Sequence, residues 1–586
     1  MRFIVAIVCF VVAFVAISYG IAQRTILATP DHVAATTDVS TQAAVTFIDG
    51  SVLNANDGRQ KILIAGSDMV FAAYGRTSDV LAWIGDTSYN SLTLDPETSA
   101  LENTFVPGAE ASVPDPHDSD LWLAEYTREK SLTFIVNVPN DVSVIIVSDG
   151  VEPAPGQVSI TWPVDNRTPW SGPLIVGGML LLLAGLGLYL WALSHLRKAR
   201  GPRRRPPRMP KPPKRLKYKP QKQKALPASR GRRAAGRAGM AVPVLLIASL
   251  ALSGCTADSW PEFLGGSAET PTPTPTETAG PVVTDKPPVV TVSQLESIVG
   301  RVAATAQQAD VARDSDLIKT RFAGPALELR EANYAIRRVD NSYAQLAAIP
   351  SSPVEVTLPQ QNDKWPRTVF TVIQDPEDDT VPSTAMMLVQ QSPRENYKAV
   401  YVVQLESSAG TLPAMAAAEV GTQRLQPDVK LFTLAPDQLA LDYGDVMLKG
   451  EESEFFKVFD LENDSLYASI GFDAKQARKA TIPAIASMTF GNAIGDGEII
   501  PMVTNDNGAI VAVYLKETET VRPTEAGAII NAEGAVKSLS GVSSTTKGTI
   551  ATYGDQLLFY LPPASSDRKI QLIGWASGLV AAQEYS

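Results

Sequence analysis

The stretch PLIVGGMLLLLAGLGLYLWALSHLRKARGPRRR, residues 173–205, changes from an apolar run to a basic one. As a helix rising about 1.5 Å per residue, residues 173–196 can cross the roughly 30 Å hydrocarbon core of a bilayer. Trp170 precedes the run, and Tyr189 and Trp191 lie near its far end, where aromatic residues favour the membrane–water interface. The stretch therefore predicts a transmembrane helix, and the rest of the chain is placed relative to it.

A basic, proline-rich segment, residues 197–238, follows this helix. It carries eighteen Lys and Arg and no acid, although the whole chain has a net charge of −11. Positive charge beside a transmembrane helix marks the cytoplasmic side, so we expect a cytoplasmic loop. Attachment to anionic lipid heads is a second interpretation. Nucleic-acid binding is disfavoured because Tyr218 is the only aromatic residue available for stacking. The basic residues expected at the membrane surface include Arg203, Arg204, Arg205, Lys214 and Arg215.

A further apolar run, residues 239–255, ends in a lipobox-like sequence. Leu252, Ser253 and Gly254 precede Cys255, as in the bacterial lipoprotein pattern of an aliphatic residue, two small residues and cysteine. The thiol of such a cysteine takes a diacylglyceryl group, and a peptidase cuts before it. We predict lipidation of Cys255, which would strengthen the anchorage of a run that is short for a membrane span. A plain third transmembrane helix with a chance cysteine is the alternative.

The N-terminal segment, residues 1–24, is the remaining apolar run. Phe3 to Ala22 is almost wholly apolar and long enough to span a bilayer. We predict an uncleaved anchor. A cleavable signal peptide is the alternative, although its apolar region would be long against the usual length of about 7–15 residues.

These segments together predict a multi-pass protein of the cell membrane with a cytoplasmic N-terminus. If the basic loop is cytoplasmic, the 173–196 helix runs from outside to inside, and residues 25–170 lie outside. The 239–255 run then leads outward again. The C-terminal residues 256–586 are therefore expected to be extracytoplasmic too, with membrane lipid as a partner of the chain.

The first soluble segment, residues 25–170, has the pattern of an all-β domain. Short alternating or apolar runs, such as 61–65, 69–74 and 80–84, are separated by turn sequences such as Asp49-Gly50. Short β-rich runs at this spacing, without a clear amphipathic helix, predict an all-β sandwich ectodomain.

The C-terminal region begins with a Pro/Thr-rich stalk, residues 256–290, which composition predicts to be stiff and extended. Beyond it, Ser293 and Glu296 fit a capping box at the start of a helix. Further helices are expected at 326–338, 436–448 and 474–489. Strands are expected at 354–358, 367–374, 384–391, 398–405, 499–504, 509–516, 548–551, 556–561 and 570–574, with Asn505–Gly508 as a hairpin turn.

The order of helices and then strands restarts near residue 434. Gln294-Leu295, Gly300 and Val302 also recur 144 residues later, as Gln438-Leu439, Gly444 and Val446. We therefore predict two tandem α+β units, residues 291–433 and 434–586. Each unit would be a helix-backed antiparallel sheet that resembles the NTF2-like or cystatin-like plan, and that plan by itself selects no function.

Motifs for enzymatic chemistry are weak in this chain. Residues 256–586 contain neither Cys nor His, which excludes thiolate or imidazole chemistry there. The acids between Asp375 and Asp379 and those between Asp115 and Asp120 are interpreted as exposed loops. We expect no cofactor and no metal site.

The layout as a whole resembles uncharacterised membrane proteins of actinobacteria. The resemblance rests on VSITWP at 158–163, the RRRPP segment at 203–207, LSGC at 252–255 and WPRTVF at 365–370. It implies topology rather than an activity, because that family has no activity to carry over.

The sequence thus predicts a non-enzymatic cell-envelope protein, a binding or assembly scaffold that presents two ectodomains outside the membrane. Its partners would be a cell-wall polymer or another envelope protein. Alternatives are an enzyme or enzyme accessory acting on cell-wall glycan, and a substrate-binding component of a transport system. Converging acids in an open C-terminal pocket would favour the enzyme, whereas a filled interior would favour the scaffold.

Overall fold

The computed structural model of this chain describes residues 2–27, 30–39, 43–95, 98, 100–164, 168–199, 286–375, 381–406 and 412–586. Contacts divide them into two compact units. The first unit holds two long apolar helices, and the second holds residues 35–55, residues 60–160 and the C-terminal region.

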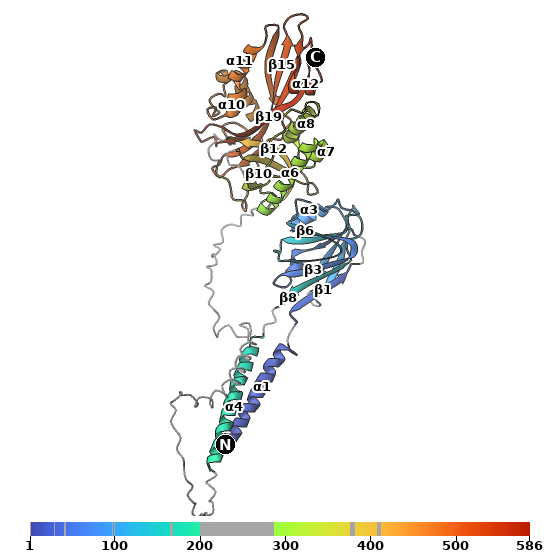
Figure 1. Cartoon of the computed structure of the whole chain (residues 1–586), viewed down its shortest axis with the longest axis vertical. Coiled ribbons are helices and arrows are strands. Elements are labelled where there is room, and N and C mark those ends of the chain that lie inside the picture. Colours follow the sequence, from blue (N-terminus) through green and yellow to red (C-terminus); the bar gives the residue numbers. More distant parts are fainter. Residues whose placement is uncertain are drawn as a thin grey trace, which may run out of the picture. The chain divides into compact units, whose positions relative to one another are not determined.

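The two apolar helices of the first unit are α1 (Arg2–Arg24) and α4 (Ser171–Ala199), which lie side by side (Figure 1). They run antiparallel, because Gly20 lies against Ile175 whereas Gly185 lies against Cys9. A Cβ atom on Gly20 would be 2.8 Å from Ile175, so glycine allows a close approach of the helices. Both are long and apolar enough to cross a membrane, a test that an N-terminal signal sequence also passes.

An eight-stranded sheet forms from the segment expected to be all-β. Its order is β1-β8-β3-β7-β2-β4-β5, with β6 also paired to β3. The strands are β1 (His32–Asp38), β2 (Val45–Ile48), β3 (Gln60–Arg76), β4 (Tyr89–Leu94), β5 (Leu101–Val106), β6 (Ala124–Val136), β7 (Val142–Val147) and β8 (Gln157–Pro163). The β-rich character predicted for this segment is confirmed.

This sheet differs from the expected sandwich of two separate sheets. Its strands are hydrogen-bonded into one sheet because β3 is seventeen residues long and pairs with several neighbours. The register of β3 against β6 shifts between Ala65 and Met69, and Gly66 there has φ +101°, a value that glycine adopts readily. Two runs predicted as separate strands are thus one bent strand.

Two short helices accompany the sheet: α2 (Gly50–Leu53) and α3 (Thr77–Ile84). The predicted strand at 80–84 is wrong, since these residues belong to α3. Val80, Trp83 and Ile84 are buried, and their spacing of three and four residues places them on one helical face. A short apolar run does not by itself distinguish a strand from a buried helix.

A nine-stranded antiparallel sheet forms the centre of the C-terminal region. Its order is β13-β15-β18-β19-β12-β11-β10-β9, and β14 pairs with β15 beside β13. The strands are β9 (Val354–Pro359), β10 (Arg367–Ile373), β11 (Thr384–Gln390), β12 (Lys398–Leu405), β13 (Ala486–Ile494), β14 (Ile500–Val503), β15 (Ala509–Pro523), β18 (Thr549–Leu561) and β19 (Gln571–Glu584). Strands β16 (Ile530–Asn531) and β17 (Ser544–Thr545) form a small separate pair.

Helices cover both halves of this sheet. The helices α6 to α8 lie together beside β10 and β12, and α10 and α11 lie together elsewhere on the domain (Figure 1). Their bounds are α6 (Val292–Ala312), α7 (Ser315–Lys319), α8 (Gly324–Val339), α9 (Leu439–Lys449), the 3₁₀ helix η4 (Gly450–Glu452), α10 (Ser465–Ile470), α11 (Phe472–Thr481) and α12 (Gly534–Ser540). The capping box of α6 pairs Thr291 with Gln294, two residues before the predicted pair.

Strands β9 to β12 form the first half of this sheet, and β13, β14, β15, β18 and β19 form the second. The two halves pack face to face across a filled core. Phe370, Met387 and Tyr401 of the first half share one apolar cluster with Ile510, Tyr514 and Leu558 of the second. Around Phe370, Met387 and Leu558 there is no volume for a water molecule. The other faces pack against α6 and α8 in one half and against α9 in the other. These strands are therefore buried on both faces.

The two predicted α+β units share this one sheet. Strand β12 of the first segment pairs with β19 of the second, through Gln404 with Trp575 and Leu405 with Gly574. The helix predicted at 474–489 ends at Thr481, and its last four residues, 486–489, belong to β13, which pairs with the long strand β15. The predicted Asn505–Gly508 turn is confirmed, with Asn507 at φ 61°.

Candidate functional site

The residues predicted to carry the lipid anchor and the basic surface lie outside the described residues. They are Leu252, Ser253, Gly254 and Cys255 for the lipobox, and Arg203, Arg204, Arg205, Lys214 and Arg215 for the basic segment. These assignments stay predictions. The described residues instead contain two features that sequence reasoning missed, a polar interface inside the second unit and a cavity beside Trp575.

The first feature is a buried ion pair that joins residues 60–160 to the C-terminal region within the second unit. Arg367, at the start of β10, places Nη2 2.6 Å from Oδ1 of Asp79 in α3, and both side chains are almost fully buried. The Arg367 guanidinium also lies 3.8 Å from the ring centre of Trp365, a cation–π contact. Trp365 in turn packs against the apolar core formed by residues 45–147. The WPRTVF segment therefore anchors one domain in the other.

Asp120 forms a second buried contact between the same two domains. Its Oδ2 lies 2.6 Å from Nη1 of Arg321 and accepts a hydrogen bond from the Tyr397 backbone N–H at 2.8 Å. Its own backbone N–H donates to the side chain of Asn396. The acidic loop at 115–120 is therefore divided. Asp120 is buried against arginine, whereas Asp115 is exposed and hydrogen-bonded to His117.

Further polar contacts surround these buried pairs. Arg394 donates to the Trp83 and Ile84 carbonyls at 2.9 and 2.7 Å and pairs with Glu110. It thereby satisfies carbonyl groups at the C-terminal end of α3, where basic side chains are favourable. The Gln294 amide reaches the Leu121 carbonyl at 3.2 Å. Several directional hydrogen bonds and ion pairs therefore fix the position of residues 60–160 against residues 286–586.

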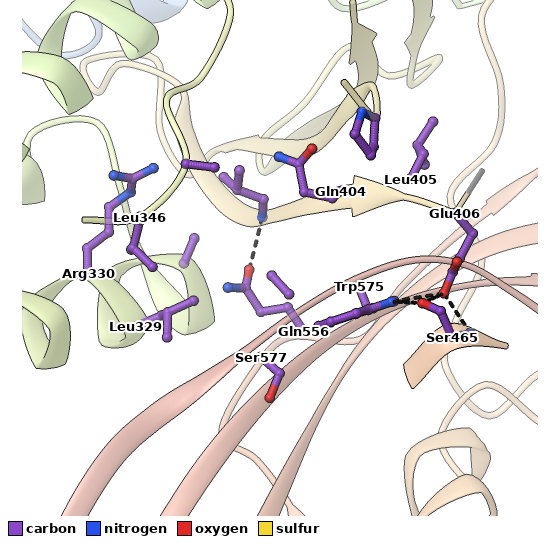
Figure 2. A pocket seen from close by; sticks show the side chains of 15 residues that line it. Leu329, Arg330, Leu346, Gln404, Leu405, Glu406, Ser465, Gln556, Trp575 and Ser577 are labelled. Atoms are coloured by element: carbon purple, nitrogen blue, oxygen red, sulfur yellow. Dashed lines mark hydrogen bonds between the residues drawn. The ribbon is translucent and has the colours of Figure 1, made fainter. Parts of the chain in front are cut away.

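The second feature is a cavity of about 390 Å³ where β12 and β19 separate (Figure 2). Only two residue pairs join these strands. Beyond them the cavity is lined by β12, β18, β19 and α8. Its size suits a small-molecule site, which typically combines apolar walls with a few placed polar groups. Its lining includes Leu329, Arg330, Gln404, Glu406, Gln556 and Trp575.

A hydrogen-bond network holds the indole of Trp575 at the edge of this cavity. Its Nε1 donates to Glu406 at 2.9 Å and to Ser465 Oγ at 3.0 Å, and the Ser465 backbone N–H also donates to Glu406 (Figure 2). Trp575 also packs on the apolar cluster beneath α9. Glu406 therefore orients the indole. Its carboxylate already accepts these hydrogen bonds, whereas a catalytic acid would have its carboxyl group free to meet a substrate.

A second cavity, of about 490 Å³, contains charged residues that are already paired. Lys475 of α11 lies 2.9 Å from Glu517 of β15, with both side chains buried. Burial raises the pKa of Glu517, although the nearby Lys475 ammonium opposes the shift. Burial, reinforced by Glu517, raises the pKa of neighbouring Asp555 to about 7. Among the described residues, no group of three or more His, Cys, Asp or Glu is arranged to hold a metal ion.

The predicted carboxylate cluster after β10 is only partly described. Asp375 follows the strand, and residues 376–380 lie outside the described residues. Asp375 itself lines neither cavity.

The family comparison agrees with the boundary of the C-terminal region. The family described as Domain of unknown function (DUF8094) matches residues 286–584. The chain belongs to this family. No curated protein and no solved structure matches the chain. The DUF8094 match covers both segments for which separate α+β units were expected, in accord with the single sheet that joins them.

Proposed function

We propose that this DUF8094 protein is a non-enzymatic cell-envelope membrane protein that presents two joined ectodomains outside the membrane. The observation that carries the proposal is the buried pairing of Asp79 with Arg367 and of Asp120 with Arg321. Buried pairs of this kind require both domains in one compartment, because each charge left alone would be costly.

The antiparallel helix pair adds an argument about topology. If α1 and α4 cross the membrane, residues 25–170 leave and re-enter at one end, and residues after 199 emerge at the other. The C-terminal domain contacts residues 60–160, so the chain must cross the membrane once more before residue 286. The sequence offers the 239–255 run for this crossing. The helix pair therefore favours the multi-pass arrangement, whether that run is a helix or a lipoprotein signal.

The filled core supports a non-enzymatic role. The space between the two half-sheets is occupied by apolar side chains such as Phe370, Met387 and Tyr514. The acids near the two cavities are mostly bound to partners, as Glu406 is to Trp575 and Glu517 to Lys475. Glycoside hydrolysis needs two carboxyl groups facing each other across a free space. A binding or assembly role in the envelope agrees better with this arrangement.

Single-cysteine labelling tests the proposal. Both native cysteines are replaced by alanine, and cysteine is introduced as Ser112→Cys, Ser565→Cys or Ser229→Cys. Ser112 and Ser565 are exposed, one in each ectodomain, and Ser229 belongs to the basic loop. We expect a membrane-impermeant maleimide to label the first two in intact cells and the third only after lysis. Protection of either ectodomain position in intact cells would contradict the proposal.

A further inference from the structure

The cavity beside Trp575 is lined by a side-chain amide, that of Gln556, whose nitrogen opens onto it. Gln556 of β18 is only 1% exposed, and its Oε1 accepts a hydrogen bond from the Val402 backbone N–H at 2.9 Å. Its amide nitrogen has no hydrogen-bond partner within the described part of the chain, and it turns toward the part of the cavity near Leu329 (Figure 2). The nitrogen is accessible from the cavity, so a ligand acceptor at this point can take the place of water.

Trp575, on the neighbouring strand β19, supplies an apolar platform. Trp575 is held by Glu406 and Ser465, so its ring is positioned before any ligand arrives. Pro382 and Leu405 also line the cavity. The amide nitrogen of Gln404 donates a hydrogen bond to Thr384 Oγ1 at 3.1 Å, and the amide oxygen of Gln404 is left as an acceptor. The cavity thus offers one aromatic face, one amide donor group and one amide acceptor.

The charges of the cavity disfavour an ionic ligand. The guanidinium of Arg330 is paired with Asp310 at 2.5 Å, and both side chains are buried. Glu406 already accepts hydrogen bonds from Trp575 and Ser465. A wholly apolar ligand would leave the Gln556 amide unpaired. A neutral ring with an apolar C–H face and several hydroxyl groups can pack that face on Trp575. Its hydroxyl groups can form hydrogen bonds with the Gln556 and Gln404 amides.

We propose that this cavity is a binding site for one ring of a neutral saccharide. The apolar face of the ring lies on Trp575, and its hydroxyl groups bond to Gln556 and Gln404. This inference deepens the proposed scaffold role by naming a ligand class. It depends on the cavity alone, so its test is independent of the labelling experiment on topology.

Calorimetric titration of the full-length protein in nanodiscs tests the inference. The probes are tetra-N-acetylchitotetraose and maltotetraose, with palmitate and tetra-alanine as apolar and peptide comparisons. We expect saturable binding of at least one oligosaccharide and of neither comparison. Trp575→Phe removes the indole donor and part of the platform, and should weaken binding at least about tenfold. Gln556→Glu keeps an acceptor for Val402 but loses the amide donors, and should weaken binding at least about fivefold.

Matched controls lie outside the cavity. Trp365 donates to Gln390 through its indole nitrogen, so Trp365→Phe and Gln390→Glu repeat the same chemical changes elsewhere. Both controls should bind the oligosaccharide as the natural protein does, and thermal unfolding checks that each variant is folded. The inference is overturned if neither oligosaccharide binds, or if binding is unchanged in folded Trp575→Phe and Gln556→Glu. Palmitate or tetra-alanine binding that depends on Trp575 would overturn the saccharide assignment.

Discussion

Arg367 and Asp79 are 288 positions apart in the chain, yet their side chains form a buried ion pair with a separation of 2.6 Å. The pair joins the start of β10 to α3 and lies beside Trp365, whose ring contacts the same guanidinium. The contact gives a structural role to Trp365 and Arg367, where the sequence predicted only that a strand begins at residue 367.

Removal of one member of this pair should destabilise the protein strongly. Asp79→Ala leaves the Arg367 guanidinium buried without its counter-ion, and we expect a loss of about 3–5 kcal/mol in the free energy of unfolding. Denaturant titration of the detergent-solubilised protein measures it. Glu110→Ala is the matched control, because the Glu110 side chain is half exposed and Arg394 keeps its carbonyl partners. Equal losses in the two variants would contradict the importance given to the buried pair.

The stability of the C-terminal domain should depend on pH through Asp555. Burial raises its pKa from 3.8 to about 7, so folding favours the protonated carboxyl. The stabilisation is fully present below 3.8 and is lost as the pH rises through 7. Asp555→Asn mimics the neutral form. We expect its free energy of unfolding, relative to the natural protein, to rise by about 1 kcal/mol or more between pH 5 and pH 8.

Asp506→Asn is the control for this pH effect. Hydrogen bonds from Thr504 and Tyr560 outweigh burial and hold the pKa of Asp506 below its ordinary value, so Asp506 does not titrate between pH 5 and pH 8. The difference between Asp506→Asn and the natural protein should stay constant over that range. A constant difference for Asp555→Asn as well would refute the assignment.

Two glycine substitutions should act in opposite directions. A Cβ atom at Gly554 would lie 2.1 Å from the Tyr514 hydroxyl, which itself bonds to Glu328 at 2.8 Å. Gly554→Ala should therefore destabilise the protein by about 1–3 kcal/mol. A Cβ atom at Gly300, inside α6, meets nothing within 4 Å. Gly300→Ala should stabilise the helix by about 0.5–1 kcal/mol. Thermal unfolding of both variants checks the signs.

The lipid anchor remains a prediction with a direct test. Cys255→Ala removes the thiol that would take the diacylglyceryl group, so radioactive palmitate should no longer label the protein. Cys9→Ala removes the other cysteine and should leave the label unchanged. Unchanged label and gel mobility in Cys255→Ala would leave the plain third helix as the better interpretation.

The local pattern predicted most elements of the C-terminal region well. Strands β9 to β12 begin and end within about one residue of the predicted runs, because period and turn residues are local signals. The Asn505–Gly508 turn was predicted for the same reason. The errors fall where an apolar run fits two structures, as at Val80–Ile84, which is helical, and at Ala486–Thr489, which is strand.

The sequence by itself determined the two apolar helices, the β-rich character of residues 25–170 and most strands of the C-terminal region, since these depend on composition and on neighbours a few residues apart. The tertiary structure alone decided that β12 pairs with β19 and that Arg367 meets Asp79. It also decided that Gln556 and Trp575 line one cavity. These relationships join residues far apart in the chain, and their energies come from burial and charge pairing that exist only once the domains are packed.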